Sequence, residues 1–157
     1  MTLESSIASR RHFVVQMSCA AASLALLGTA LPGCNSPTAP SLVDHPIPSA
    51  NAAIVNGALR LTVDPTSPLA TVGNAVLIEN GLGKFLVART GQETFDALTA
   101  VCTHFGCTIV RYDNLIYECP CHGSRFSSTG SVVRGPASSP LRQFPTTFAG
   151  DLLTIVV

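Results

Sequence analysis

Short runs of apolar residues, separated by turn residues, follow one another along the chain from about residue 53 onward. In the run ALRLTV, Leu59, Leu61 and Val63 fall on one face, as they do in a strand that is buried on one side. The next two runs, AVLIEN and KFLVAR, are joined by Gly-Leu-Gly, in which glycine permits a tight turn. The pattern therefore predicts three strands in the first half of a domain.

The rest of the chain predicts further strands in pairs. The run FDALTAV is followed by TIVRY and LIYEC, which flank Asp113 and Asn114. We interpret these two residues as the loop of a tight hairpin that brings Tyr112 close to Leu115. The last run, RQFPTTFAGDLLTIVV, predicts a final strand pair that turns at Gly-Asp. No part of the domain has a helical period over enough residues, and no internal repeat is present, so the fold class is all-β.

The first 34 residues have the layout of an export signal. Arg10 and Arg11 precede the apolar run VVQMSCAAASLALLGTA, which ends at a Pro-Gly pair. The arginine pair resembles a twin-arginine signal, because serine precedes it and Phe13 follows it closely. An ordinary amphipathic helix is the alternative, but the run has no polar face. We predict that residues 1–34 are a signal or anchor segment.

Three outcomes after export stay open. The sequence LPGC resembles a lipoprotein cleavage box, which would leave a lipid on Cys34. Residues 14–31 are also close to the minimum length of a membrane-spanning helix, and simple release is the third possibility. Residues 35–52, rich in Pro, Ser and Asn, are predicted to be a tether in which His45 is solvated, and residues 53–157 to be the domain.

Composition argues against nucleic acid as a partner and against a helical fold. The chain has 157 residues, with nine basic and nine acidic side chains and Lys84 as its single lysine. This balance argues against nucleic acid as a partner. The abundant Gly and Pro favour a turn-rich β protein over a helical bundle.

The predicted hairpin carries the chemistry of the chain. The motif CTHFGC (102–107) precedes its first strand, and CPCHGS (119–124) follows its second, so both loops lie at one end of the ribbon. A single metal cannot easily use Cys119, Cys121 and His122 together, because cysteines on either side of Pro120 point in different directions. One of these cysteines is therefore expected to have another role.

These motifs resemble the Rieske iron–sulfur family, whose pattern is C-x-H followed by C-x-x-H. The resemblance implies an antiparallel β sandwich with a small cluster-binding subdomain and a [2Fe-2S] cluster. In such centres two cysteines hold one iron and two histidines hold the other. By position, Cys102 and Cys119 would bind one iron, and His104 and His122 the other.

The remaining cysteines resemble those of the cytochrome bc-type branch of the family. Cys107 and Cys121 stand where that branch has a disulfide that joins the two cluster loops, so the resemblance implies this pairing here. A disulfide needs an oxidising compartment, which the export signal would supply.

Further positions take their expected roles from the same resemblance. Ser124 matches a serine that donates a hydrogen bond to a bridging sulfide. Phe126 stands where relatives have a tyrosine that donates to a cysteine sulfur, which would lower the potential of this protein. Gly135 and Pro136 resemble the start of the proline loop that covers the cluster.

Two other readings of the motifs are weaker. A zinc site could use two cysteines and two histidines, but it leaves Cys107 and Cys121 without a role. A ring-hydroxylating oxygenase needs a further iron held by two histidines and a carboxylate, and only His12 and His45 remain outside the motifs.

We therefore expect a one-electron carrier on the periplasmic side of a bacterial membrane, held there by its N-terminal segment or a lipid. The expected partners are cytochrome c- or b-type proteins, with quinol as a further candidate, in a quinol-oxidising cytochrome bc-type complex. The small subunit of a periplasmic oxidoreductase such as an arsenite oxidase, bound to its large subunit, and a stand-alone carrier are the alternatives. Phe105 counts against the quinol-oxidising assignment, because quinol-oxidising relatives usually have leucine there on the docking surface.

Overall fold

The computed structural model describes residues 45–157. The predicted signal or anchor segment, Cys34 and most of the predicted tether lie outside the described residues. No helix among residues 45–157 is long and apolar enough to cross a membrane.

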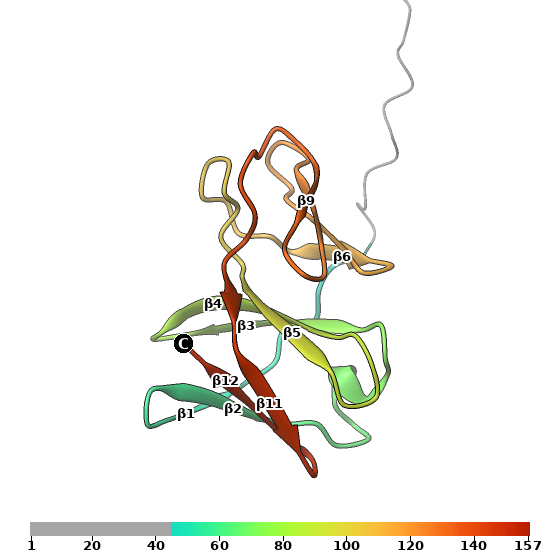
Figure 1. The fold of residues 1–157 in the computed structure, drawn as a ribbon, viewed down its shortest axis with the longest axis vertical. Helices are drawn as coiled ribbons and strands as arrows, with labels where there is room; N and C mark the ends of the chain where they lie inside the picture. Colours follow the sequence, from blue (N-terminus) through green and yellow to red (C-terminus); the bar gives the residue numbers. More distant parts are fainter. Residues whose placement is uncertain (1–44) are drawn as a thin grey trace, which may run out of the picture. The chain divides into compact units, whose positions relative to one another are not determined.

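The described residues form three antiparallel four-stranded sheets and one short 3₁₀ turn, η1 (Pro68–Ala70) (Figure 1). The first sheet has the order β1 (Ala53–Val55), β2 (Ala58–Thr62), β12 (Leu152–Val156), β11 (Thr146–Ala149). The second has the order β10 (Gln143–Phe144), β5 (Phe95–Thr99), β4 (Gly83–Arg89), β3 (Ala75–Asn80). The third has the order β6 (Arg111–Asp113), β7 (Ile116–Glu118), β8 (Arg125–Ser127), β9 (Val132–Arg134). The prediction of an all-β fold is confirmed.

The second sheet is the middle layer of the domain, which explains its continuous apolar runs. In β3, Val76 and Ile78 pack in a core shared with the first sheet. The alternate residue Leu77 packs in a second core, shared with the third sheet. Side chains of a strand alternate between faces, so a strand covered on both sides needs apolar residues at every position.

The third sheet and its loops form an insertion in the sandwich. The chain leaves the middle sheet after β5 and returns as β10, which pairs with β5 through Gln143↔Leu98 and Phe144↔Ala97. Residues 100–142 therefore project from one edge of the sandwich as a separate small unit, which we call the cluster unit (Figure 1). Both ends of the cluster unit continue into paired strands of the middle sheet. The sandwich therefore holds the unit that carries both cysteine motifs.

The hairpin of the cluster unit differs by one residue from the prediction. Tyr112 pairs with Tyr117 and Asp113 with Ile116, so the two loop residues are Asn114 and Leu115 rather than Asp113 and Asn114. Both loop residues have positive φ, 47° and 64°, as a two-residue hairpin turn requires. Asparagine tolerates this conformation well, whereas leucine rarely adopts it, so a turn at Leu115 is not expected from its residue type.

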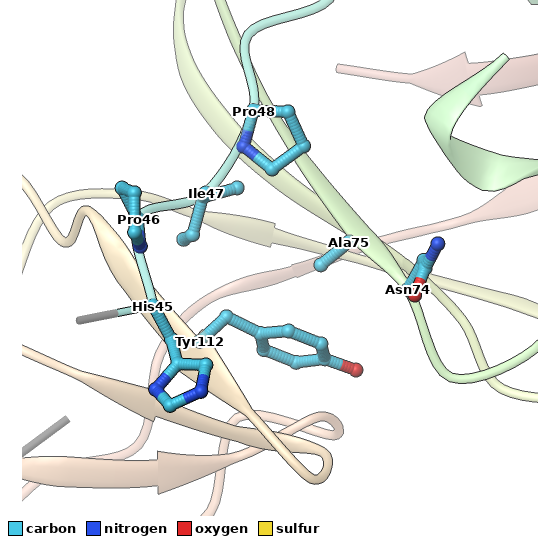
Figure 2. A pocket seen from close by; sticks show the side chains of 7 residues that line it. All are labelled: His45, Pro46, Ile47, Pro48, Asn74, Ala75 and Tyr112. Carbon is cyan, nitrogen blue, oxygen red and sulfur yellow. The ribbon is translucent and has the colours of Figure 1, made fainter.

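The segment 45–50 lies against both the sandwich and the cluster unit. The Ile47 N–H donates to the Val110 carbonyl at 2.9 Å, and the Tyr112 N–H donates to the His45 carbonyl at 3.1 Å. On the other side, the Ala50 N–H donates to Leu77 at 2.9 Å. A small pocket lies beside this segment, with the Tyr112 ring between His45 and Asn74 (Figure 2). The His45 side chain is exposed, as expected.

Candidate metal-cluster site

The two motif loops have the same backbone arrangement. In the first, the Cys102 N–H donates to the carbonyl of Cys107, and Gly106 donates back to Cys102, both at 2.9 Å. In the second, Cys119 donates to Ser124 at 2.9 Å, and Gly123 donates back to Cys119 at 3.0 Å. The first cysteine of each loop therefore has an equivalent backbone environment.

A glycine four residues after each first cysteine makes this loop possible. Gly106 has φ of 74° and Gly123 has φ of 73°. Residues with a Cβ rarely adopt this left-handed conformation, so glycine is the residue that fits.

Cys102 and Cys119 are buried, unpaired cysteines, with 2% and 1% of their surface exposed. Their side chains are in hydrogen-bond contact with each other. Burial raises the pKa of the Cys119 thiol, while the backbone N–H groups of Cys121 and His122, which donate to its sulfur, oppose this rise. Donors directed at a buried sulfur are typical of a sulfur that ligates a cluster.

The two motif histidines form a second pair. The rings of His104 and His122 have centroids 4.9 Å apart and lie nearly perpendicular. His122 is exposed, whereas Nδ1 of His104 is buried and has no hydrogen-bond partner within residues 45–157. A buried imidazole nitrogen without a partner is costly, so this atom fits a metal ligand.

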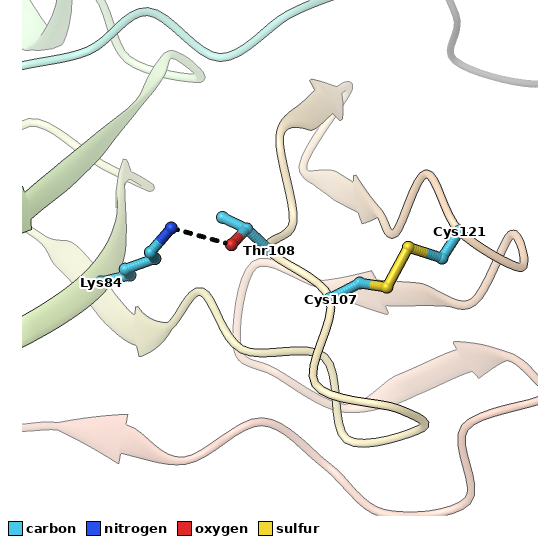
Figure 3. The surroundings of a disulfide bond; sticks show 4 residues. All are labelled: Lys84, Cys107, Thr108 and Cys121. Carbon is cyan, nitrogen blue, oxygen red and sulfur yellow. Dashed lines mark hydrogen bonds between the residues drawn. A yellow bond between two sulfur atoms is a disulfide. The ribbon is translucent and has the colours of Figure 1, made fainter.

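A disulfide joins Cys107 to Cys121, with a Cα–Cα distance of 6.5 Å (Figure 3). The pairing implied by the family resemblance is confirmed. On the sandwich side of Cys107, the Lys84 Nζ donates to the Thr108 hydroxyl at 3.1 Å, which ties the first loop to the middle sheet (Figure 3).

The loop 135–140 is fastened to both motif loops. The Thr103 hydroxyl donates to the Ser139 carbonyl at 2.6 Å. The Ala137 N–H donates to Oγ of Ser124 at 3.0 Å. Gly135 and Pro136 are exposed at the start of this loop. Oγ of Ser124 is fully buried and accepts here, so its own proton remains available for a further hydrogen bond.

Phe126 is fully buried in the same core as Cys102 and Cys119. It lies opposite Tyr117 across β7 and β8. The sequence places an apolar ring rather than a hydroxyl at this position below the two cysteines.

A buried group of ion pairs, which was not predicted from the sequence, supports the second loop. Glu118, which precedes Cys119 directly, is 1% exposed. Its carboxylate accepts from Arg125 Nε at 2.7 Å and from Arg111 at 3.3 Å. These residues are neighbours across β6, β7 and β8, so they fix the strands that carry the loop. A correct hairpin register was the only signal that could have found them.

The side-chain set fits a two-metal cluster better than a single ion. The structure brings the two free cysteines together and the two histidines together, as two pairs. Within the described residues, the one compact group of three potential ligand atoms is Cys107, Cys119 and Cys121, and two of these are in the disulfide. The four residues of the zinc alternative therefore do not gather around one point.

The comparisons with known proteins agree with this geometry. A family described as the Rieske [2Fe-2S] domain matches residues 61–145. The cytochrome b6-f complex iron–sulfur subunit of Chlorobaculum thiosulfatiphilum is 36% identical over 98 residues, which are 61% of this chain and 52% of that protein. The same subunit of Gloeobacter violaceus is 35% identical over 100 residues, which are 62% of this chain and 52% of that protein. The chain thus spans about half the length of the curated relatives it matches.

Among solved structures, the cyanobacterial plasma membrane Rieske protein PetC3 from Synechocystis PCC 6803 aligns with a TM-score of 0.51 at 28% identity. The match covers 60% of this chain and 97% of that one. Fold and site together define a β-sandwich protein that holds a metal cluster between two loops. The chain belongs to the Rieske [2Fe-2S] domain family, and its cofactor is a [2Fe-2S] cluster.

Loss of the disulfide should destabilise this site. The bridge closes a loop with a sequence separation of 14. We expect Cys107→Ser or Cys121→Ser to lower the free energy of unfolding by about 3 kcal/mol in the chain-entropy model. The cluster should still assemble, but it should be lost at a lower temperature when visible absorbance is followed on heating.

The double variant is the control for this prediction. It breaks the same bond, so it should be no less stable than the single variants. Free thiols at both positions in protein isolated without reductant would contradict the pairing.

Proposed function

We propose that this protein is a one-electron carrier whose cluster is held by Cys102 and Cys119 at one iron and by His104 and His122 at the other. The observation that carries the proposal is the arrangement of the four side chains in two pairs. The cysteine pair is buried in the core, and the histidine pair includes the exposed His122.

The cluster, when bound, accepts and returns one electron at a potential that the two imidazole ligands raise above that of clusters with four cysteines. The protein residues hold it in place. Cys102 and Cys119 anchor it to the core, and the loop 135–140 keeps water from its side, because Thr103 and Ser124 bind that loop. His122 opens toward solvent and provides the shortest route for an electron to a partner.

Phe105 provides an exposed apolar side chain beside the histidines for contact with a partner. Its ring is 76% exposed and lies 4.3 Å from the His104 ring, centroid to centroid. An exposed aromatic ring beside the electron route favours a partner with an apolar docking surface.

We further propose that the protein is the iron–sulfur subunit of a membrane complex of the cytochrome b6-f or bc type that oxidises quinol. The names and the identity of the relatives support this assignment. The twin-arginine-like segment with Arg10 and Arg11 supports a location on the periplasmic side of the membrane. In this proposal residues 1–34 anchor the subunit, directly or through a lipid on Cys34, and residues 35–52 are the tether.

Purification of the tagged protein from its native membranes tests this assignment. We expect b-type and c-type cytochromes to co-purify, and quinol to reduce the cluster in the isolated complex. A variant with Arg10→Lys and Arg11→Lys is the control for export and should accumulate in the cytoplasm. Isolation with a large oxidoreductase subunit, or with no partner at all, would contradict the assignment.

The ring of Phe126 should set a lower potential than a tyrosine would. A hydroxyl that donates to a cysteine sulfur stabilises the reduced cluster, which carries more negative charge, and Phe126 has none. If Phe126→Tyr adds a bond that favours the reduced state by about 1 kcal/mol, the potential should rise by roughly 40 mV. Potentiometry at one pH measures this shift.

Phe85→Tyr is the matched control for this change. Phe85 is equally buried, but it packs in the core between the first and second sheets. Its substitution should leave the potential unchanged. An unchanged or lower potential in Phe126→Tyr would show that the ring does not face a cysteine sulfur.

A further inference from the structure

Three sulfur atoms lie together at one side of the site, and only two of them belong to the disulfide. The Sγ atoms of Cys107, Cys119 and Cys121 are all within 4.8 Å of one another. Cys107 and Cys121 form the disulfide, whereas Cys119 is a free and buried thiol. A free thiol so close to a disulfide is in a position to attack it, because thiol–disulfide exchange needs only access and a nucleophilic sulfur.

We propose that Cys119 exchanges with the disulfide whenever the cluster is not bound, and that cluster binding prevents this reaction. The Cys119 thiolate attacks Sγ of Cys107, the Cys107–Cys121 bond breaks, and a Cys107–Cys119 bond forms. The bonding electron pair leaves on Sγ of Cys121, which takes up a proton. One thiol and one disulfide are present before and after the step, so it needs no oxidant.

Cys107 is the sulfur that Cys119 attacks. Cys119 and Cys121 are separated by Pro120 alone, and a bond between them would close a very small ring around a residue with a fixed φ. Cys107 belongs to the other motif loop, so a Cys107–Cys119 bond still joins the two loops. The exchanged protein is therefore expected to keep its fold.

The exchange rests on the proposed role of Cys119 as a cluster ligand, because a sulfur bonded to iron is not free to attack. It turns the loss of a cluster into a lasting change. Once Cys119 is in a disulfide, the protein lacks one ligand and cannot take up a new cluster until that bond is reduced. Insertion of the cluster before the disulfide closes avoids this outcome.

Two cysteine variants of the full chain form a matched test. Cys102→Ser and Cys119→Ser each remove one proposed ligand, but only the second removes the sulfur that lies beside the disulfide. Both proteins are isolated without reductant, checked for native strand content by circular dichroism and held at neutral pH for hours, since uncatalysed exchange takes minutes to hours. Acid quenching, labelling with N-ethylmaleimide and peptide mapping then give the disulfide pattern.

In Cys102→Ser we expect a Cys107–Cys119 peptide and label on Cys121. In Cys119→Ser we expect the native Cys107–Cys121 peptide alone. Wild-type protein stripped of its cluster with a chelator should behave like Cys102→Ser, and it decides the question if that variant does not fold. A native Cys107–Cys121 pattern in the cluster-free wild-type protein would overturn the exchange.

Visible absorbance separates this failure from a failure of the proposed ligand set. If Cys102→Ser keeps its absorbance, Cys102 is not a ligand and the proposed function must be revised. If it loses its absorbance and keeps the native disulfide, the ligand set stands and the exchange is wrong.

Discussion

Replacement of His122 by alanine should abolish the Rieske signal of the reduced protein. His122 is an exposed residue, so its loss costs little packing but removes one of the two proposed nitrogen ligands of the outer iron. We expect the rhombic EPR signal with an average g value below 2 to disappear. Far-ultraviolet circular dichroism should stay that of a β protein, because the sandwich cores lie elsewhere.

His45→Ala is the matched control for this experiment. His45 is also exposed and lies among the described residues, but it lines the pocket beside the segment 45–50. Only its backbone carbonyl is used, as the acceptor for Tyr112, and alanine keeps that group. The EPR signal should be normal in this variant. A normal signal in His122→Ala as well would remove His122 from the ligand set.

The Glu118→Gln variant should be the least stable of the single substitutions considered. Glu118 is buried and holds Arg111 and Arg125 through its two carboxylate oxygens. The amide keeps the shape of the side chain but removes the negative charge that both guanidinium groups contact. Breaking a buried ion pair on one side typically costs about 3–5 kcal/mol, which a denaturant titration can measure.

Glu79→Gln tests whether the loss of stability in Glu118→Gln comes from the burial of its ion pairs. Glu79 also pairs with a cation, Lys84, at 2.8 Å, but both side chains are about half exposed. Exposed pairs contribute roughly 0–1 kcal/mol, so this variant should have nearly wild-type stability. If both variants lose the same small amount of unfolding free energy, the ion pairs of Glu118 do not hold the second loop in place.

The strands of the sandwich could be predicted because their side chains obey simple alternation. Leu59, Leu61 and Val63 are all buried on one face of the first sheet, as their spacing indicates. The pairing of AVLIEN with KFLVAR also follows the prediction, with Leu77 opposite Leu86. These features depend on local patterns that the sequence records directly.

The register of the hairpin was beyond this kind of argument. The loop moved by one residue because Leu115 adopts a positive φ, which leucine rarely does. A shift of one residue in the loop changes every partner across the ribbon by two positions. The predicted register therefore did not place Glu118 opposite Arg111, and the ion cluster could not be seen.

The candidate site residues were easier to predict from the sequence than the residues that hold them in place. The resemblance of the two motifs to the family implies Cys102, His104, Cys119 and His122 as ligands. It also implied the Cys107–Cys121 pairing that the structure contains. Thr103 donates a hydrogen bond to the loop 135–140, and Ser124 accepts one from it. Only folding brings this loop close to the two motifs. The closeness of Cys119 to the disulfide is likewise a property of the folded chain.

Pulsed EPR on reduced protein labelled with ¹⁵N-histidine tests the central claim most directly. Electron spin on the cluster couples strongly to nitrogen atoms bonded to iron and weakly to all others. We predict two strongly coupled ¹⁵N nuclei in the wild-type protein, from His104 and His122. A reduced cluster with no strongly coupled nitrogen, or a colourless protein that contains zinc, would contradict the account.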